Sequence, residues 1–321
     1  MLLHLRVTVP PDRTPEVLEL FSGSAGTAHL AVLPGASRSP RGDLVMADVA
    51  RESADDLIAE LRRLGIARDG GISMEAVDAA VSTAAERAEA RAPGDGADAV
   101  VWEEVVRTTD ADSALSASYL SFLTIATLLA GVAIINDSAI LTIGAMVLGP
   151  EFATLAALAV AVVHRRHSIA RRALVTLTVG FAVAIGVTAL GVLAGRALGW
   201  FGAEVLTAER PETGFITAPD RWSLVVAVLA GIAGVLSLTS ARSGALVGVF
   251  ISVTTVPAAA DMAVSLALGG GDEFARAATQ LGINLLGILA AALATLTVQR
   301  TVWRHVPRVV PRVVTVGRAP H

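Results

Sequence analysis

The sequence predicts an α-helical polytopic membrane protein whose six transmembrane helices form two inverted three-helix repeats, preceded by an N-terminal α+β domain. Of the 321 residues, 54% are hydrophobic and only 17% are charged, whereas a soluble protein usually has about a quarter of its residues charged. The charge is also unevenly divided: residues 1–112 hold 20 acidic residues and 11 arginines, and residues 113–321 hold 9 and 14. Six long apolar stretches follow the acidic part, which therefore precedes a membrane domain.

Residues 1–77 are predicted to form the α+β domain. LLHLRVTVP alternates apolar and polar residues, as a half-buried strand does, and Thr14 and Pro15 follow as the N-cap and first residue of a helix. TAHLAVLPG and GDLVMADVA are two further strands, SADDLIAELRRLG is a helix with Ser53 as N-cap and Gly65 at its end, and GGISMEAV is a fourth strand. The resulting βαββαβ order is that of ferredoxin-like or ACT-like domains. Such a domain serves either as a regulatory or dimerising module or as a passive cap.

The segment PGASRSPRG connects the second and third predicted strands. It places Arg38 and Arg41 beside glycines, so the two guanidinium groups are candidates for holding an anionic regulatory ligand. The alternative is a hairpin tip that is merely solvated.

Residues 78–112 are predicted to be a linker with an interfacial helix. An Ala/Glu/Arg helix is interrupted by Pro-Gly-Asp-Gly and followed by an amphipathic piece around Trp102, Val105 and Val106. This piece either lies at the membrane surface, where an indole ring is favourable, or packs on the soluble domain.

Residues 113–299 are predicted to be the transmembrane domain, because a helix needs about 20 apolar residues to cross roughly 30 Å of hydrocarbon. The six stretches of this length are Ser113–Ile135, Ser138–Val163, Ala173–Gly195, Trp222–Ala241, Ser243–Gly269 and Ala277–Gln299. Several of them contain runs of small residues such as GIAGVL and GINLLGILAAAL, which favour close helix packing.

The placement of arginine predicts the orientation, because cytoplasmic loops are enriched in basic residues. HRRHSIARR lies between the second and third stretches, Arg242 between the fourth and fifth, and five arginines follow the sixth, whereas the opposite loops are mostly acidic. We therefore expect both termini, including a basic tail at residues 300–321, to lie on the cytoplasmic side of a bacterial inner membrane. The chain opens without a basic segment followed by a short apolar one, so no cleaved signal peptide is expected.

The second and fifth stretches resemble each other and occupy equivalent places in the two halves. Each runs apolar residues into a proline, Pro150 or Pro257, and each has a carboxylate nearby, Glu151 or Asp261. Six crossings divide into two sets of three, and two similar halves with an odd number of crossings must be inserted upside down relative to one another. The sequence thus predicts an inverted repeat with a broken helix in each half.

A proline inside an apolar helix removes an amide proton and leaves a carbonyl without its helical partner, which is tolerated in a membrane only where the break faces protein or water. A carboxylate at that depth costs at least about 2.5 kcal/mol and indicates a functional site. We therefore predict a midplane site for a cation or proton. Its residues are Glu151, Asp261, Gly149, Pro150, Thr255, Pro257 and Asn284.

A purely structural interpretation remains open at this point. Pro150 would then be a simple kink with Glu151 capping the helix that follows. Asp261 would be bonded to a neighbour such as Asn284 or Thr255.

SAILTIGAMVLGPEFATLAALAVAV and the later SGALVGVFISVTTVPAAADMAVSLALG resemble the two proline-containing helices of a prokaryotic family known as the uncharacterised hydrophobic domain, or domain of unknown function 389. AVVWEEVVR resembles the family's usual lead-in. The resemblance implies a multi-pass inner-membrane protein and no established activity. The family's first motif more commonly continues with apolar residues and another Gly-Pro, so Glu151 is expected to mark a branch.

The predicted function is secondary transport of a small solute or ion, gated by the cytoplasmic domain. The alternatives are an ion channel and a membrane sensor or scaffold without flux. No enzyme is expected, because the apolar stretches lack a catalytic or metal-binding set recognisable by spacing, and the absence of cysteine excludes disulfides and thiolate metal sites. We expect no cofactor, no bound metal and no nucleic acid. The expected partners are the lipid bilayer, a small solute or a monovalent cation or proton, and further copies of the chain in a homo-oligomer.

Overall fold

The computed structural model describes residues 1–92, 99–206, 208–214, 221–240 and 247–302, and for 247–254 and 302 it describes the backbone alone. The chain divides into two compact units, the first built mainly from Met1–Glu104 and the second from Val105–Leu238 and Ser243–Arg304. The Pro-Gly-Asp-Gly part of the predicted linker, Arg242 and the basic tail from residue 303 lie outside the described residues.

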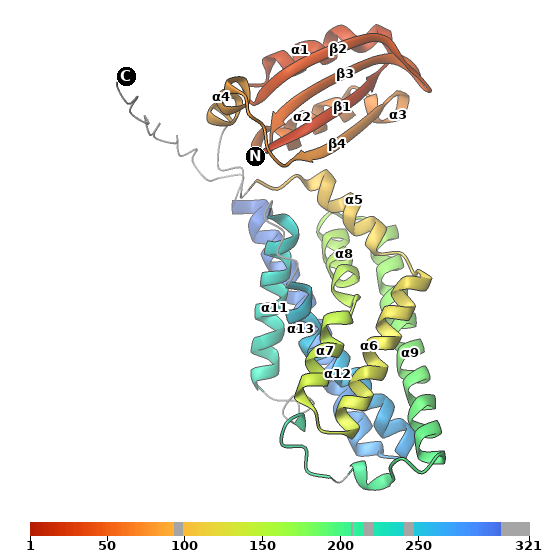
Figure 1. Ribbon diagram of the computed structural model, residues 1–321. Helices are drawn as coiled ribbons and strands as arrows, with labels where there is room; N and C mark the ends of the chain where they lie inside the picture. Colours follow the sequence, from red (N-terminus) through yellow and green to blue (C-terminus); the bar gives the residue numbers. More distant parts are fainter. Residues whose placement is uncertain (93–98, 207, 215–220, 241–246, 303–321) are drawn as a thin grey trace, which may run out of the picture. The chain divides into compact units, whose positions relative to one another are not determined.

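The first unit is a four-stranded antiparallel sheet with two main helices on one face (Figure 1). In chain order its elements are β1 (Leu2–Val9), η1 (Pro11–Arg13), α1 (Thr14–Gly23), β2 (Thr27–Arg38), β3 (Arg41–Ala50), α2 (Arg51–Arg63), α3 (Ile66–Asp69), β4 (Gly71–Val77) and α4 (Thr83–Arg91). The sheet order is β2-β3-β1-β4. Alternate residues of β1 and β3 join α1 and α2 in one core, and the members without solvent exposure include Leu5, Val7, Val45, Phe21 and Leu61. The predicted βαββαβ order is therefore confirmed.

Two predicted helix caps are wrong, because tertiary contacts set the helix starts. Thr14 is the first residue of α1, and its hydroxyl donates a 2.7 Å hydrogen bond to Asp43 on β3. Ser53 lies inside α2, which begins at Arg51 directly after β3. The buried Arg51 side chain donates to the Ala99 carbonyl at 2.9 Å, which holds the start of α2 in place. Gly65 ends the α2 segment as predicted, in the left-handed conformation with φ of 78°.

The amphipathic helix of the linker, α5 (Trp102–Asp112), has its first residues in the first unit. Val101, just before it, is fully buried in the core of that unit, and the Trp102 amide donates to the Asp55 carboxylate at 3.0 Å. The start of this piece thus contacts the soluble domain through the Trp102 amide, and from Val105 onwards it belongs to the second unit.

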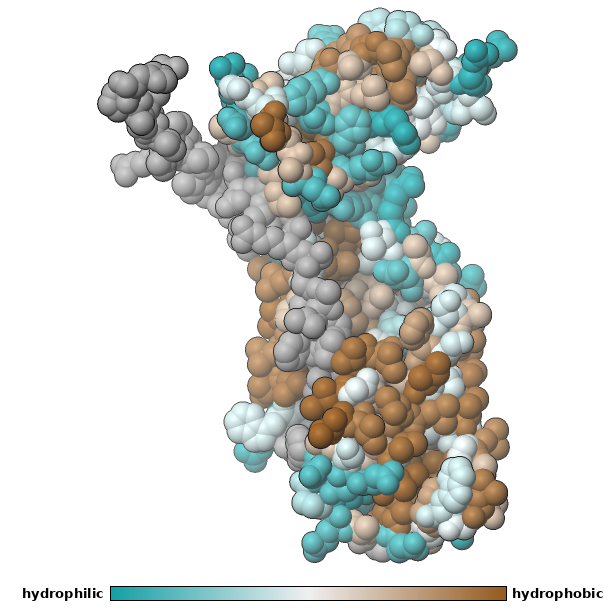
Figure 2. Space-filling model, in the orientation of Figure 1, coloured by the Kyte–Doolittle hydropathy of each residue, from teal (hydrophilic) through white to brown (hydrophobic). Residues whose placement is uncertain are grey.

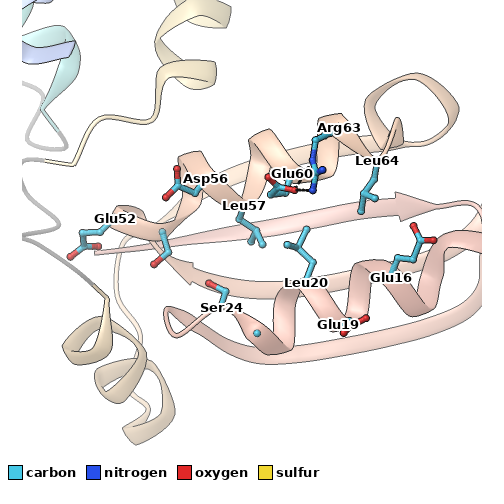
Figure 3. A pocket seen from close by; sticks show the side chains of 12 residues that line it. Glu16, Glu19, Leu20, Ser24, Glu52, Asp56, Leu57, Glu60, Arg63 and Leu64 are labelled. Atoms are coloured by element: carbon cyan, nitrogen blue, oxygen red, sulfur yellow. Dashed lines mark hydrogen bonds and ion pairs between the residues drawn. The ribbon is translucent and has the colours of Figure 1, made fainter. Parts of the chain in front are cut away.

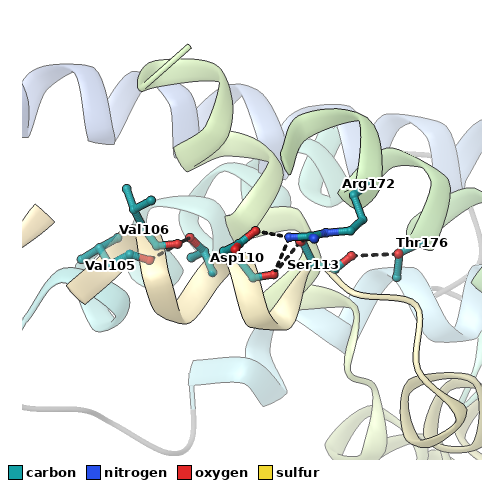
Figure 4. A network of polar contacts seen from close by, with 7 residues as sticks. Val105, Val106, Asp110, Ser113, Arg172 and Thr176 are labelled. Carbon is teal, nitrogen blue, oxygen red and sulfur yellow. Dashed lines mark hydrogen bonds and ion pairs between the residues drawn. The ribbon is translucent and has the colours of Figure 1, made fainter. Parts of the chain in front are cut away.

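The C-terminal end of α5 is tied into the second unit by a polar network (Figure 4). Arg172 donates to the Ser113 hydroxyl at 2.8 Å and also pairs with the Asp110 carboxylate. The Thr176 hydroxyl donates to the Ser113 carbonyl at 2.9 Å. Arg172 belongs to the segment HRRHSIARR, so this arginine of the predicted cytoplasmic loop has a structural contact.

The second unit consists of apolar helices (Figure 1). They are α6 (Ala117–Ile135), α7 (Ala139–Leu148), α8 (Glu151–Val163), α9 (His167–Ala197), α11 (Arg221–Thr239), α12 (Val247–Leu268) and α13 (Gly271–Val302), with the short η2 (Ala203–Leu206) after α9. Four helices, α6, α9, α11 and α13, are long and apolar enough to cross a membrane, and the bent α7–α8 pair makes a fifth span if it is counted as one. This unit is that of a polytopic helical membrane protein.

The surface of the helical unit supports the same conclusion. Figure 2 shows a broad hydrophobic band over it, and side chains such as Phe122, Leu190, Leu229 and Leu286 are each more than half exposed. An apolar surface of this extent is unusual on a soluble monomer and indicates contact with lipid.

Small residues bring α11 and α13 together. A Cβ atom added at Gly231 would lie 2.5 Å from the Ile288 carbonyl oxygen, and one added at Gly287 would lie 3.1 Å from the Ala227 Cβ. The two glycines thus permit backbone contact, and the predicted close-packing role of these small residues is confirmed for this helix pair.

Candidate functional site

The central feature of the helical unit is the break between α7 and α8. α7 ends at Leu148, Gly149 is extended, and Pro150 has φ of −90° and ψ of 0° as the residue before α8. The two helices are bent by 49°. Because proline has no amide proton and crowds the preceding turn, the helix cannot continue through this point. The predicted break at Pro150 is confirmed.

Glu151 is the first residue of α8 and has no solvent exposure. The Thr255 hydroxyl, also fully buried, donates a 2.6 Å hydrogen bond to Glu151 Oε1. The amides at the start of a helix favour a negative charge, so the break itself places a stabilising environment around this carboxylate. Glu151 and Thr255 are two predicted site residues that the structure brings together.

Tyr119 and Thr154 extend this polar cluster toward α6. Tyr119 is close enough to Glu151 for an electrostatic interaction between the two side chains. The Tyr119 ring packs directly on Gly180 of α9, because a Cβ atom added at Gly180 would lie only 2.6 Å from Tyr119 Cε1. The fully buried Thr154 donates to the Asp112 carbonyl at 3.3 Å. Neither residue was predicted from the sequence, since a tyrosine and a threonine in apolar helices carry no distinctive spacing.

Asn284 lies at the same depth as Thr255 in the hairpin of α12 and α13. Thr255 is 13 residues before the last residue of α12 and Asn284 is 13 residues after the first residue of α13, which places both about 20 Å from the connecting turn. Asn284 accepts a hydrogen bond from Gln280 at 3.4 Å, and both side chains are fully buried. Gln280, one turn before Asn284, is a further polar residue that was not predicted.

Asp261 makes a different contact from the one expected. It is largely buried and pairs with Arg210 at 2.9 Å, and Arg210 also donates to the Val205 carbonyl at 3.0 Å. Asp261 follows Thr255 by six residues, which is about 9 Å along α12 and a third of a turn around it. Asp261 therefore lies on another face of the helix from the residue that contacts Glu151. The signal for Arg210 was present in the sequence as a lone arginine between Glu209 and Glu212.

The loop that carries Arg210 is also attached to the turn after α6. Asp137 there has a positive φ of 46° and accepts hydrogen bonds from the Thr213 hydroxyl at 2.8 Å and the Thr213 amide at 3.0 Å. The Ala139 amide donates to Glu212 at 3.2 Å. Hydrogen bonds to Asp137 and Ala139 thus hold the loop that places Arg210 beside Asp261.

The predicted break at Pro257 is wrong, because α12 runs from Val247 to Leu268 with Pro257 inside it. Val256 and the three alanines that follow the proline have no solvent exposure. Close packing on both sides supports the helix across the one hydrogen bond that proline removes. The discontinuity that the sequence suggested for both halves occurs at Pro150 alone.

Arg38 and Arg41, the predicted anion ligands, belong to the first unit. They are exposed and directly opposite each other at the end of the β2–β3 hairpin. The strands extend further into PGASRSPRG than expected, with Gly35 at φ of 62° donating its amide to Asp43 at 2.8 Å. Two like charges opposite each other repel, so an anion between them would relieve that repulsion.

No group of three or more His, Cys, Asp or Glu side chains with metal-binding geometry occurs among the described residues. In the parts of the chain that the structure describes, the polar cluster around Glu151 thus offers one carboxylate with the hydroxyl groups of Thr255, Tyr119 and Thr154. That chemistry suits a proton or a monovalent cation better than a divalent metal.

Residues 146–290 match the family described as Domain of unknown function (DUF389). The chain is also similar to Uncharacterized protein MJ0678 of Methanocaldococcus jannaschii, with 26% identity over 194 residues that cover 60% of this chain and 58% of the relative. The chain thus matches less than two thirds of the length of this relative. No solved structure matches the chain. The family resemblance seen in the sequence is confirmed.

Proposed function

We propose, from the premise that residues 146–290 belong to the family of domain of unknown function 389, that this protein is a secondary transporter. In this proposal a small solute or ion crosses the membrane in exchange or symport with a proton or monovalent cation. Glu151 at the α7–α8 break binds the coupling ion.

One observation carries the proposal: a carboxylate with no solvent exposure begins a half-helix at a proline break and accepts a hydrogen bond from a second helix. A carboxylate at this depth is costly and persists where it serves a function. Discontinuous helices with an ion at the exposed helix end are a recurring design of secondary transporters. Protonation or cation binding at Glu151 would change both its charge and its bond to Thr255, and so couple occupancy to the packing of α8 against α12.

The proposal includes six crossings, with α6, α7–α8 and α9 forming one half and α11, α12 and α13 the other. The basic segment between α8 and α9 and the acidic loops on the opposite side support cytoplasmic termini in a bacterial inner membrane. An inverted relation between the halves follows from their odd number of crossings. The break in the first half alone makes the proposed repeat asymmetric.

Arg210 and Asp261 are proposed to close the site from the outer side. Under the same topology α12 ends outside, with Asp261 seven residues and Thr255 thirteen residues before Leu268, which corresponds to about 10 and 20 Å. The ion pair then lies between Glu151 and the exterior. Opening on that side would separate Arg210 from Asp261 and move the loop that follows η2.

The test is flux in proteoliposomes loaded with a pH-sensitive dye, driven in turn by proton, sodium and potassium gradients and by a panel of small solutes. Glu151→Gln should abolish ion-coupled flux, and the matched control Glu209→Gln, an exposed loop residue, should leave it intact. Asp261→Asn should weaken the coupling by loosening the outer closure.

Each other outcome separates one alternative from this proposal. Full ion-coupled flux in both Glu151→Gln and Asp261→Asn contradicts the site. Non-saturating flux without coupling indicates a channel. Absence of flux with every gradient and solute in the unmodified protein favours the sensor or scaffold.

A further inference from the structure

The helical face of the first unit contains a groove that the transport proposal does not use. It lies between α1 and α2 and has a volume of about 580 Å³. Leu20, Leu57 and Leu64 form its apolar part, and Figure 3 shows these side chains between the two helices. The groove is thus bounded by two rigid elements of the same unit.

Carboxylates dominate the edges of this groove. The acidic lining residues are Glu16, Glu19, Glu52, Asp56 and Glu60. Arg63 is the basic lining residue, and it donates to Glu60 at 2.9 Å. Glu16, Glu19 and Asp56 are exposed, and none of the three has an ion-pair partner among the described residues. A partner for this surface needs positive charges at the edges and apolar side chains over the leucines.

The C-terminal tail of the same chain has this chemistry. Residues 306–313 read VPRVVPRV, a tandem repeat that places Arg308 and Arg312 four residues apart among valines. Arg304 and Arg318 flank the repeat, and residues 303–321 contain no acidic residue. The repeat thus supplies both positive charges and apolar side chains within eight residues.

We propose that residues 304–318 bind in the groove between α1 and α2 of the same polypeptide. The valines cover Leu20 and Leu57, and the arginines pair with Glu16, Glu19 and Asp56. The tail thereby tethers the end of the membrane domain to the soluble unit. High salt weakens this contact, because the paired charges lie at the exposed edges of the groove. The contact rests on the proposed six-crossing topology, which places the tail and the first unit on the same side of the membrane.

Disulfide trapping in the full-length protein tests the contact, because the chain has no cysteine of its own. Ser24→Cys lines the groove and is combined with Val310→Cys in the tail. The matched control combines Val310→Cys with Ser73→Cys, which is exposed on β4 opposite Arg6, away from the helices. Under mild oxidation in native membranes, the groove pair should cross-link about tenfold more than the control pair, because a docked segment has a high effective concentration at its site.

Two perturbations should reduce the groove cross-link to the level of the control. One is removal of the charges at the groove edges in the triple variant Glu16→Gln, Glu19→Gln, Asp56→Asn. The other is a salt concentration of about 1 M, at which the Debye length falls to roughly 3 Å. Equal cross-linking of the groove and control pairs at low salt would overturn the proposal, as would a groove cross-link that ignores both perturbations.

Two further readouts identify the cause of a negative result. An impermeant maleimide applied to vesicles of known orientation shows whether Ser24→Cys and Val310→Cys are labelled from one side; labelling from opposite sides overturns both the topology and the contact. Co-expression of two differently tagged copies shows whether the disulfide joins separate chains. Disulfides formed only between copies overturn binding within one polypeptide and leave the transport site unaffected.

Discussion

Thr255 and Glu151 are 104 positions apart in the chain, yet the threonine hydroxyl lies 2.6 Å from the glutamate carboxylate. This bond joins the uninterrupted α12 to the first residue after the α7–α8 break. A change of charge at Glu151 would therefore alter a hydrogen bond to α12 and so affect the packing of that helix.

The first prediction concerns this bond. Thr255→Val keeps the shape of the side chain but removes a hydrogen-bond donor from a buried carboxylate, which should cost about 1 to 3 kcal/mol of stability. Thr255→Ser retains the hydroxyl and should remain close to the parent protein. Reversible denaturation in mixed detergent micelles measures the difference, and a loss in Thr255→Ser with none in Thr255→Val would show that the methyl group, and not the hydroxyl, stabilises the protein.

The second prediction separates the two prolines. Pro150→Ala permits a straighter α7–α8 segment and removes the helix end from Glu151, so its coupled flux should fall to that of Glu151→Gln. Pro257→Ala lies within a continuous helix and restores a backbone hydrogen bond, so this variant should keep its flux with an equal or higher unfolding midpoint. Loss of flux in the Pro257 variant alone would reverse the roles assigned to them.

The third prediction concerns the Arg210–Asp261 pair, whose side chains are only 14% and 11% exposed. Arg210→Met or Asp261→Leu alone leaves one charge without its partner and should destabilise the protein by about 3 kcal/mol or more, whereas the double variant should recover much of that loss. A double-mutant cycle on unfolding midpoints measures the coupling. Additive losses would mean that the two side chains are energetically independent.

The fourth prediction tests the close contact of α11 and α13. Gly231→Ala places a methyl group 2.5 Å from the Ile288 carbonyl and 2.8 Å from the Ala291 Cβ, and overpacking of this kind typically costs about 1 to 3 kcal/mol. Gly282→Ala on α13 has no atom within 4 Å of the new Cβ and should be neutral or stabilising. Thermal unfolding measures the midpoints of both variants, and equal midpoints would contradict the close contact of α11 and α13.

The fifth prediction is a pH dependence in the first unit. Burial raises the pKa of Asp48, but hydrogen bonds from His29 at 2.6 Å and His4 at 2.7 Å prevail and lower it. His29 is also 2.7 Å from the Ser82 hydroxyl, which caps α4.

A lowered pKa in the folded state means that the Asp48 contribution is complete above the unfolded value near 3.9 and is lost as the pH falls through the folded value. Hydrogen-exchange protection of α4, corrected for intrinsic rates, should therefore fall on acidification below about pH 4. Asp48→Asn should show the lower protection already at neutral pH, and Asp12→Asn, exposed elsewhere, should behave as the parent. A pH profile unchanged in Asp48→Asn would contradict the assignment.

The order of elements in the first unit and the break at Pro150 were predictable because local patterns specify them. Strand alternation, turn residues and proline act over a few neighbouring positions. The N-caps at Thr14 and Ser53 failed for the opposite reason, since contacts with Asp43 and Ala99 from distant parts of the chain fix where those helices start.

The same limit applies to the site. Glu151 was predicted because a carboxylate beside a proline in an apolar segment is conspicuous in any reading of the sequence. The partner of Asp261 was not predicted, because Arg210 lies 51 residues away in a loop. Pro257 gave the same local signal as Pro150, yet the helix continues through Pro257 and ends before Pro150, a difference that the local sequence pattern does not display.

The two edges of the sheet in the first unit differ in regularity. β2 pairs with β3 with register shifts between Ala28 and Ala31 and between Leu33 and Ser37, whereas β4 pairs with β1 without a shift from Gly71 to Val77. Irregular edges resist the addition of foreign strands and regular ones accept it. At high protein concentration, self-association by strand addition should therefore begin at β4. Introducing a proline or an additional charge in β4 should prevent this association.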